Sequence, residues 1–341
     1  MRTSRALLLA LGAAAAGGWL YQRRPPRRGD FRFDGRVVLV TGGSRGLGLI
    51  LARKLTSRGA RVAICARDEA ELARARDDVA RYGAEPLVVA CDVADAGDAR
   101  RCVARVEDAL GPIDVLVNNA GRIVVGPESS MTIEDYRRTM DVNFFGAVHV
   151  TDAVLPSMRR RREGRIVNVG SFGGRIAVPH LLPYTASKFA LVGWSEGLRA
   201  ELASEGIVVT TVVPGPMRTG SGRHAWFKGR HRAEYAWFQL GASLPGLAMD
   251  PDEAAERILD ACRDGEAEVV LGAPARVATW WSEVFPGLTG QLVALADRLL
   301  PGPGGVAGAP VRGARSESAL TRSPLFTAAR RAARRHGQED G

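Results

Sequence analysis

Between residues 35 and 272 the chain alternates short apolar runs with longer stretches in which apolar residues recur at helical spacing. The apolar runs are rich in Val, Ile and Leu and have the length of buried strands. Strands that alternate with helices indicate a parallel sheet covered by helices on both faces. We therefore predict one α/β domain with a doubly wound, Rossmann-like sheet of about seven strands. The predicted strands are Val37–Val40, Arg61–Cys65, Leu87–Cys91, Ile113–Val117, Arg165–Val169, Ile207–Val213 and Glu268–Leu271, and the predicted helices begin near Gly46, Glu69, Ala96, Ile133, Tyr184 and Pro251.

An uncharged apolar run of 16 residues, 6–21, precedes this domain. It is slightly shorter than the roughly 17–25 apolar residues of a membrane-spanning helix. Four arginines follow it closely, and positive charge favours the cytoplasmic side of a membrane. We expect a short apolar helix that anchors the protein in a membrane, with the folded domain in the cytoplasm. The alternatives are a cleaved signal peptide and a terminus without a membrane role, as in a cytoplasmic protein.

Composition divides the chain into four parts. We expect the last of them to be disordered, because it is rich in Gly, Pro, Ser and Arg. The parts are 1–30, the anchor candidate with a basic linker; 31–275, the α/β domain with a loop at 216–249; 276–300, an amphipathic helical extension broken at Pro286-Gly287; and 301–341, the basic tail.

The net charge of +10 first suggests a nucleic acid or an anionic membrane as partner. The excess lies at the two ends, however: residues 1–36 carry +6 and residues 301–341 carry +4, whereas the body is neutral. We therefore expect no nucleic-acid partner. The four cysteines form no CxxC pair and share no metal-ligand spacing with histidine, so we expect no metal site. Cys65 and Cys91 end predicted strands, and we expect them to be buried thiols.

A glycine-rich loop, Thr41–Gly48, follows the first predicted strand and opens a helix. Gly42, Gly46 and Gly48 permit a tight turn and let the backbone approach a pyrophosphate at the helix N-terminus, where free N–H groups favour anions. The spacing G-x-x-x-G-x-G differs from the usual G-x-G-x-x-G, and such a loop alone could be a simple turn. Its position between a strand and a helix favours a dinucleotide site.

Four further motifs lie at strand ends or helix starts, the edge where ligands of open α/β sheets bind. With the glycine-rich loop, they resemble the short-chain dehydrogenase/reductase family over roughly residues 36–272. Pro214-Gly215 after the sixth strand adds a further match. The four motifs are Asn118-Asn119-Ala120-Gly121, Asn143 within Val142–Gly146, Ser171, and Tyr184-Thr185-Ala186-Ser187-Lys188.

Tyr184 and Lys188 are four residues apart on one helix face, within reach of each other. A phenol with a pKa near 10 is a poor base at neutral pH, but a nearby ammonium lowers that pKa. Tyr184 can then exchange a proton with a carbonyl or alcohol oxygen that Ser171 holds by a hydrogen bond. A solvated helix face is the alternative for the Tyr-x-x-x-Lys pattern taken alone.

The family resemblance implies further roles. Lys188 would also bind the nicotinamide ribose, and Asn143 would take part in a water-mediated proton relay, whereas we expect Asn118 to tie strands together. Members of the family are commonly dimers or tetramers, so a homo-oligomer is expected. The implied catalytic residues are Asn143, Ser171, Tyr184 and Lys188, and the implied cofactor residues are Gly42, Ser44, Arg45, Gly46, Leu47, Gly48, Arg67, Asp92, Val93, Asn119, Ala120, Gly121, Tyr184, Lys188, Pro214, Gly215, Met217 and Thr219.

Charge at the end of the second strand distinguishes NADP from NAD. An acidic residue there would bind the ribose 2′-hydroxyl of NAD, but this chain has Ala66 followed by Arg67, with Arg45 in the glycine-rich loop. Two guanidiniums suit a 2′-phosphate, so we expect NADP(H) and, less favoured, NAD(H). If Arg67 instead pairs with Asp68 or Glu71, NAD would be tolerated.

The loop 216–249 lies where the family keeps its substrate loop. Its aromatic residues indicate an apolar substrate, and its positive charge indicates an anionic substrate or a membrane surface. A mobile lid with solvated charges is the alternative, and His180 could line the site or be structural. We expect an NADP(H)-dependent oxidoreductase that interconverts a carbonyl and an alcohol on a lipophilic small molecule, with Tyr184 as acid and base. A non-catalytic NADP-binding regulator or scaffold is the alternative.

Overall fold

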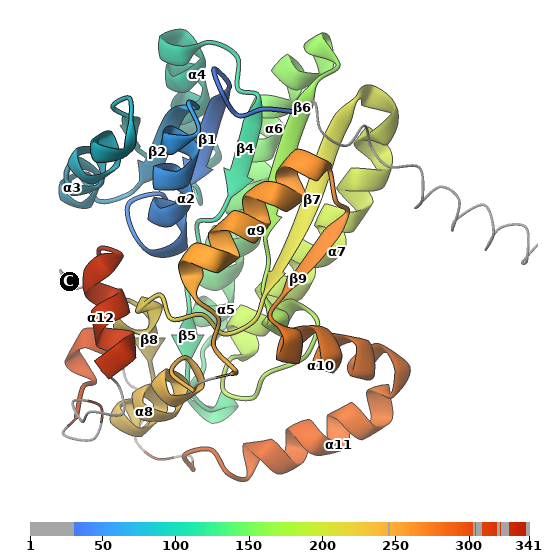
Figure 1. Ribbon diagram of the computed structural model, residues 1–341. Coiled ribbons are helices and arrows are strands. Elements are labelled where there is room, and N and C mark those ends of the chain that lie inside the picture. Colours follow the sequence, from blue (N-terminus) through green and yellow to red (C-terminus); the bar gives the residue numbers. More distant parts are fainter. Residues whose placement is uncertain are drawn as a thin grey trace, which may run out of the picture.

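A seven-stranded parallel sheet forms the centre of the molecule (Figure 1). The computed structural model describes residues 31–244, 246–302, 304, 309–318, 321 and 327–338. The strand order is β3-β2-β1-β4-β6-β7-β9, which confirms the predicted Rossmann-like sheet. The strands are β1 Val37–Thr41, β2 Arg61–Ala66, β3 Leu87–Ala90, β4 Val115–Asn118, β6 Gly164–Val169, β7 Ile207–Pro214 and β9 Glu268–Leu271.

Helices cover both faces of this sheet, and each face has its own apolar core (Figure 1). The central strand β1 is buried along its whole length, as expected of a strand with cores on both sides. Several helices begin at an aspartate whose side chain accepts from a backbone N–H of the first turn, among them Asp68, Asp95 and Asp250. One face carries α2 Gly46–Ser57, α3 Glu69–Val79 and α9 Pro251–Asp264, and the other carries α4 Ala96–Leu110, α6 Gly146–Arg161 and α7 Leu182–Leu202.

Two helix boundaries differ from those expected. Helix α7 begins at Leu182 rather than Tyr184, because Pro183 fits the first turn of a helix. A single helix was expected from Ile133, but α5 ends at Met140 and a π-helical turn, Asp141–Phe145, joins it to α6. Such turns are rare and frequently occur at functional sites, and this one contains Asn143.

A second, three-stranded sheet lies beside the main one and has the order β10-β8-β5. Its strands are two residues long and come from distant parts of the chain: β5 is Val124–Val125, β8 is Trp226–Phe227 and β10 is Val311–Arg312. The loop 216–249 thus contributes β8 and helix α8, His231–Gly241, to an ordered layer. Its positive charges are partly neutralised internally, because Lys228 pairs with Asp135 and Arg223 with Glu317.

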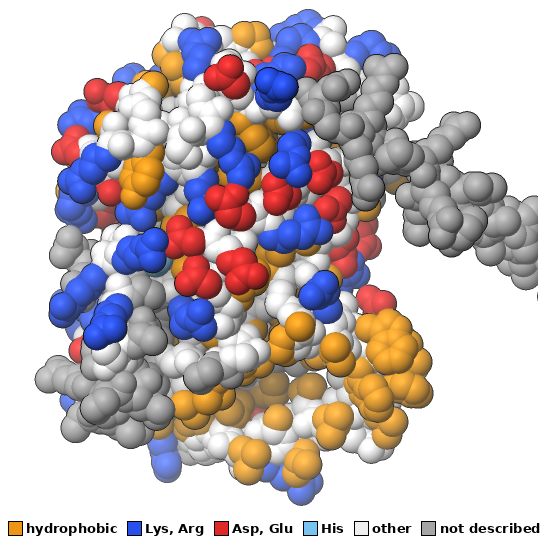
Figure 2. All heavy atoms as spheres, viewed as in Figure 1, with side chains coloured by type: hydrophobic (Ala, Val, Ile, Leu, Met, Phe, Trp, Pro, Cys, Tyr) orange, Lys and Arg blue, Asp and Glu red, His pale blue; other side chains and the backbone are white. Residues whose placement is uncertain are grey.

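The C-terminal segments are more structured than expected. Helices α10, Ala273–Val284, and α11, Pro286–Asp297, break at the predicted Pro286 and leave a run of large apolar side chains exposed (Figure 2). The sequence predicts disorder beyond Pro301, but β10 and helix α12, Thr327–Arg335, pack against the domain (Figure 1). Local composition does not reveal such contacts, since they depend on surfaces far away in the sequence.

The apolar run 6–21 and the basic residues around it lie outside the described residues. Among the helices that the structure does describe, none has the length and hydropathy to cross a bilayer.

All four cysteines are free and buried, as predicted for Cys65 and Cys91. The Sγ atoms of Cys65, Cys91 and Cys102 lie within 4.8 Å of one another, a grouping that their spacing in the sequence does not indicate. Hydrogen bonds with Cys102 and Cys91, together with burial, raise the pKa of the Cys65 thiol. This thiol therefore stays protonated and is a poor nucleophile at neutral pH.

Candidate active site

The glycine-rich loop joins β1 to α2 at the carboxyl edge of the sheet. Gly42 and Gly46 have φ angles of +65° and +57°, which side-chain-bearing residues rarely adopt. A Cβ on Gly42 would also lie 2.8 Å from the Cα of Ala120. Helix α2 begins without a side-chain cap and without an acidic residue in its first turn. The backbone of this loop and the start of α2 therefore fit an anion such as the diphosphate of a dinucleotide.

The loop after β4 meets the glycine-rich loop where the strand order reverses, the place at which such sheets bind ligands. Asn119 donates from Nδ2 to the carbonyl oxygens of Thr41 at 3.0 Å and Gly42 at 3.2 Å. Asn118 is buried and donates to Asn168 of β6 and Thr151 of α6, both at 2.9 Å. Asn118 thus ties neighbouring elements together, as the sequence predicts, while Asn119 holds the two loops in register.

The side chains of Ser171 and Tyr184 lie side by side at this edge, both within 3.6 Å of the position that a Cβ on Gly173 would take. Ser171 follows β6, and its Oγ accepts from the Gly173 N–H at 3.1 Å. Lys188 is buried one turn after Tyr184, with its Nζ 5.8 Å from the centre of the tyrosine ring. That Nζ donates to the Val169 carbonyl at 2.8 Å, which fixes the position of the ammonium beneath the phenol.

Burial has the largest effect on the pKa values of Tyr184 and Lys188. It raises the pKa of the Tyr184 phenol, and the hydrogen bond with Ser171 opposes the rise only in part. The expected lowering of this pKa by Lys188 is therefore wrong for the chain by itself, because the low-polarity surroundings penalise the phenolate more. Burial also lowers the pKa of Lys188 to about 8.

Asn143 lies in the π-helical turn and contacts helix α7, the helix that carries Tyr184. Its Nδ2 donates to the Oγ of Ser187 at 2.8 Å and to the carbonyl of Arg122 at 3.0 Å, while its Oδ1 accepts from the Arg122 N–H at 2.7 Å. Asn143 therefore connects α7 to the segment after β4. The structure thus brings all four predicted catalytic residues to one edge of the sheet.

The two arginines expected at the cofactor phosphate differ in whether they form an ion pair. Arg45 pairs with Glu71, which also accepts from the hydroxyl of Ser44 at 2.9 Å. Arg67 is exposed and forms no ion pair with any residue that the structure describes, so the alternative pairing with Asp68 or Glu71 is not observed.

Two further arginines lie near Arg45 and Arg67, and they were not identified from the sequence. Arg312 of β10 and Arg122 lie 4.3 Å and 5.1 Å from the ring centre of Trp226. Burial and the charges of Arg45 and Arg67 lower the pKa of the Arg312 guanidinium. The only sequence signal for Arg122 was its position directly after Gly121, and Arg312 belongs to the tail expected to be disordered. Positive groups thus gather here, as in a site for an anion.

The remaining predicted cofactor residues also lie at this edge. Ser44 and Leu47 belong to the glycine-rich loop and the start of α2, and Ala120 and Gly121 follow β4. Asp92 and Val93 follow β3, and the side chain of Asp92 accepts from the Ala94 N–H at 3.1 Å. Pro214 ends β7. The backbone N–H of Gly215 donates to the carbonyl of Leu271 at 3.0 Å, and the backbone N–H of Thr219 donates to the carbonyl of Met217 at 2.9 Å.

His180 and an aromatic cluster lie next to Tyr184. The Nδ1 of His180 is 2.9 Å from both carboxylate oxygens of Glu234, a fully buried residue of α8. His180 thus helps to attach α8 to the main domain, which favours the structural alternative. The cluster packed around these residues consists of Val125, Leu181, Ala225, Phe227 and Tyr235 with Ile123, Val178, Tyr184, Trp237 and Phe238 at its edge.

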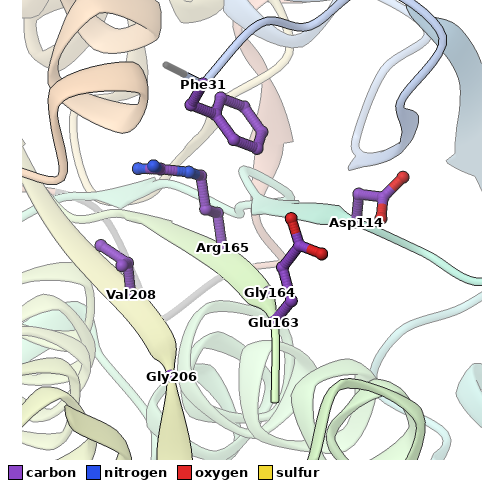
Figure 3. A pocket seen from close by; sticks show the side chains of 7 residues that line it. All are labelled: Phe31, Asp114, Glu163, Gly164, Arg165, Gly206 and Val208. Carbon is purple, nitrogen blue, oxygen red and sulfur yellow. The ribbon is translucent and has the colours of Figure 1, made fainter. Parts of the chain in front are cut away.

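A small hollow lies at the opposite edge of the sheet (Figure 3). Its lining includes Phe31, the start of β6 and Asp114, and the Arg165 guanidinium lies 4.0 Å from the centre of the Phe31 ring. Ligands of open α/β sheets bind at the carboxyl ends of the strands, whereas this hollow is at the amino ends. It does not belong to the candidate active site.

Comparison with known proteins places this chain among similar sequences and structures. A model of short chain dehydrogenases matches residues 36–227. The chain is 38% identical to a dehydrogenase/reductase SDR family protein 7-like of Anopheles gambiae over 75% of this chain and 80% of that protein. It is 37% identical to a putative ketoacyl reductase of Streptomyces coelicolor over 70% of this chain and 95% of that protein. A crystal structure of an actinorhodin polyketide ketoreductase variant with NADPH is 34% identical, with a TM-score of 0.63 over 70% of this chain and 97% of that one.

Proposed function

Since the chain belongs to the short-chain dehydrogenase/reductase family, we propose that it is an NADP(H)-dependent oxidoreductase that interconverts a carbonyl and an alcohol on a lipophilic substrate. One arrangement carries the proposal: the neighbouring side chains of Ser171 and Tyr184 lie beside Lys188, at the edge that also holds the glycine-rich loop. The alternative, a regulator that only binds NADP, would not need this set.

The roles of the residues follow from their positions. The nicotinamide, when bound, gives or takes the hydride at the substrate carbon. Ser171 holds the substrate oxygen, and Tyr184 protonates it in reduction or deprotonates it in oxidation. Lys188 stabilises the charge that develops on the phenol, while Asn143 keeps α7 and the segment after β4 in place.

A lipophilic substrate is supported by the aromatic cluster that borders Tyr184. The ketoacyl reductases among the relatives make acyl chains with a ketone a reasonable substrate class. We also propose that residues 6–21 hold the enzyme at a membrane, where such molecules partition. Removal of residues 1–30 would then shift the protein from the membrane to the soluble fraction; a full-length chain that is soluble contradicts the anchor.

A substrate screen tests the proposed activity directly. The purified protein is expected to oxidise NADPH, measured by absorbance, with at least some members of a panel of β-ketoacyl thioesters, aromatic ketones and aliphatic aldehydes. Short polar carbonyls serve as the matched control and are expected to react more slowly. Activity with polar carbonyls alone would contradict a lipophilic substrate, and inactivity throughout with intact NADPH binding would favour the regulator.

The preference for NADP is expected to depend on Arg67. Arg67→Asp places a carboxylate where the 2′-phosphate would lie, so we expect the ratio of NADPH to NADH catalytic efficiency to fall by about tenfold or more, equivalent to one good charged hydrogen bond. Arg61→Asp makes the same change at the other end of β2 and is expected to leave the ratio unchanged. An unchanged ratio in Arg67→Asp contradicts the assignment.

A further inference from the structure

The segment that follows helix α12, up to Gln338, lies on the glycine-rich loop (Figure 1). Helix α12 ends at Arg335, and Gly337 adopts a φ of +67°, the usual way to terminate a helix. Ala333, His336 and Gln338 are at most 4% exposed, so this segment is packed against the domain.

The tail occupies the anion-binding position of helix α2. The carbonyl oxygen of His336 accepts from the Gly46 N–H at 2.8 Å, one of the free N–H groups at the start of the helix. The side-chain amide of Gln338 covers the same glycine, since a Cβ on Gly46 would lie 2.5 Å from its Nε2. The carboxyl end of α12 and the amino end of α2 carry opposite partial charges, which favours this contact.

The same segment reaches the loop expected at the nicotinamide side. The Nε2 of His224 is 3.2 Å from the carbonyl oxygen of Gln338. Ala333 packs closely on Gly220, the residue after Thr219. A Cβ added to Gly220 would lie 2.6 Å from the Cα of Ala333. The docked segment therefore spans from the glycine-rich loop to residues 219–224.

Charged groups hold the base of α12 in place. The carbonyl of Arg335 accepts from Nη2 of Arg53 on α2 at 3.1 Å. The guanidinium of Arg335 lies 3.2 Å from the carboxylate of Asp252 on α9. These contacts are specific to this orientation of the helix, because they attach it to two helices of the domain at once.

We propose that the glycine-rich loop binds a second ligand, the chain's own segment from Ala333 to Gln338, and that this docked segment and the dinucleotide exclude each other. The inference rests on the proposed use of a dinucleotide. The Gly46 N–H cannot donate fully to His336 and to a diphosphate at once, and the amide of Gln338 fills the space that a diphosphate needs above that glycine. The docked state lowers the apparent cofactor affinity in proportion to its population.

Titration of NADPH, followed by its fluorescence, tests the exclusion. A chain that ends at residue 326 is expected to bind NADPH about tenfold more tightly than the full chain, if the tail is docked about nine-tenths of the time. A chain that ends at residue 338 keeps every described contact of the tail and is the matched control. A synthetic peptide of residues 327–338 is expected to weaken NADPH binding to the shortened chain competitively.

A point variant tests the docked geometry in the full chain. Gly337→Val forces a β-branched residue into a positive φ, with its Cβ 3.4 Å from Leu49, and is expected to reproduce the tighter binding. Arg331→Ala, at an exposed position of the same helix, is the matched control. Equal or weaker NADPH binding by both the shortened chain and Gly337→Val overturns the inference alone. Failure of all chains to bind NADPH or NADH overturns the proposed function and the inference with it.

Discussion

Tyr184→Phe is expected to lower kcat/KM for NADPH-dependent carbonyl reduction by about 10³-fold, within the range typical of a lost general acid. The variant keeps the aromatic ring and its packing but removes the proton that passes to the substrate oxygen. Ser171 alone cannot replace it, because its hydroxyl only holds that oxygen. Steady-state rates, with NADPH binding measured separately, distinguish lost chemistry from lost affinity.

The control is Tyr82→Phe, which removes a phenol hydroxyl from an exposed side chain outside the site. It is expected to leave kcat/KM unchanged. Near-wild-type activity in Tyr184→Phe would contradict the proposed acid, whereas a parallel loss of folding, visible as a lower Tm, would remove the chemical interpretation.

The pH profile provides an independent readout of the same pair. Burial raises the pKa of Tyr184, so the phenol stays protonated at neutral pH, as reduction requires. Lys188 has a pKa of about 8 and loses its charge as the pH rises through that value. The reduction rate of the wild-type enzyme is therefore expected to be level below about pH 8 and to fall above it, while the reverse reaction, which needs the phenolate, gains rate with pH.

The sheet and the catalytic motifs could be predicted because their signals are local. Seven apolar runs of strand length became the seven strands, and the motifs Asn118–Gly121, Ser171 and Pro214-Gly215 lie at or just after the ends of three of them. In a parallel sheet all carboxyl ends share one edge, so placing these three motifs at strand ends was enough to bring them together. Asn143 and Tyr184 lie on helical segments well beyond a strand end, and they were expected at this edge from the family resemblance rather than from the strand pattern.

Contacts between distant segments could not be predicted in this way. The second sheet joins two-residue strands from three parts of the chain, and its pairing leaves no periodic pattern. The docked tail depends on a helix end meeting a loop almost 300 residues earlier. The pKa of Tyr184 was predicted with the wrong sign, because the spacing to Lys188 is visible in the sequence and the depth of burial is not.

The ion pair between Lys228 and Asp135 also escaped prediction, since 93 residues separate them. Lys228 was counted among charges that could meet a substrate, but its Nζ is 2.6 Å from the Asp135 carboxylate and both side chains are at most 7% exposed. The same carboxylate accepts from the backbone N–H of Thr132 at 2.9 Å and so caps α5. Asp135 thus caps α5, the helix that precedes Asn143, and also attaches the loop 216–249 through Lys228.

Asp135→Ala is therefore expected to destabilise the fold by about 3–5 kcal/mol, because it leaves a buried ammonium without its partner. Denaturant unfolding followed by circular dichroism measures this change. Glu134→Ala, which removes a neighbouring carboxylate from an exposed pair with Arg138, is expected to change stability by less than about 0.5 kcal/mol.

The double variant Asp135→Ala/Lys228→Met distinguishes the cost of the unpaired, buried Lys228 ammonium from the cost of removing the cap of α5. Without an ammonium to bury, it is expected to be more stable than Asp135→Ala, and its remaining deficit should approach the roughly 1 kcal/mol of a helix cap. A double variant as unstable as Asp135→Ala would assign the whole effect to the cap. Because the pair attaches β8 to α5, recovery of stability with a persistently raised substrate KM would show that the ion pair also positions the loop over Tyr184.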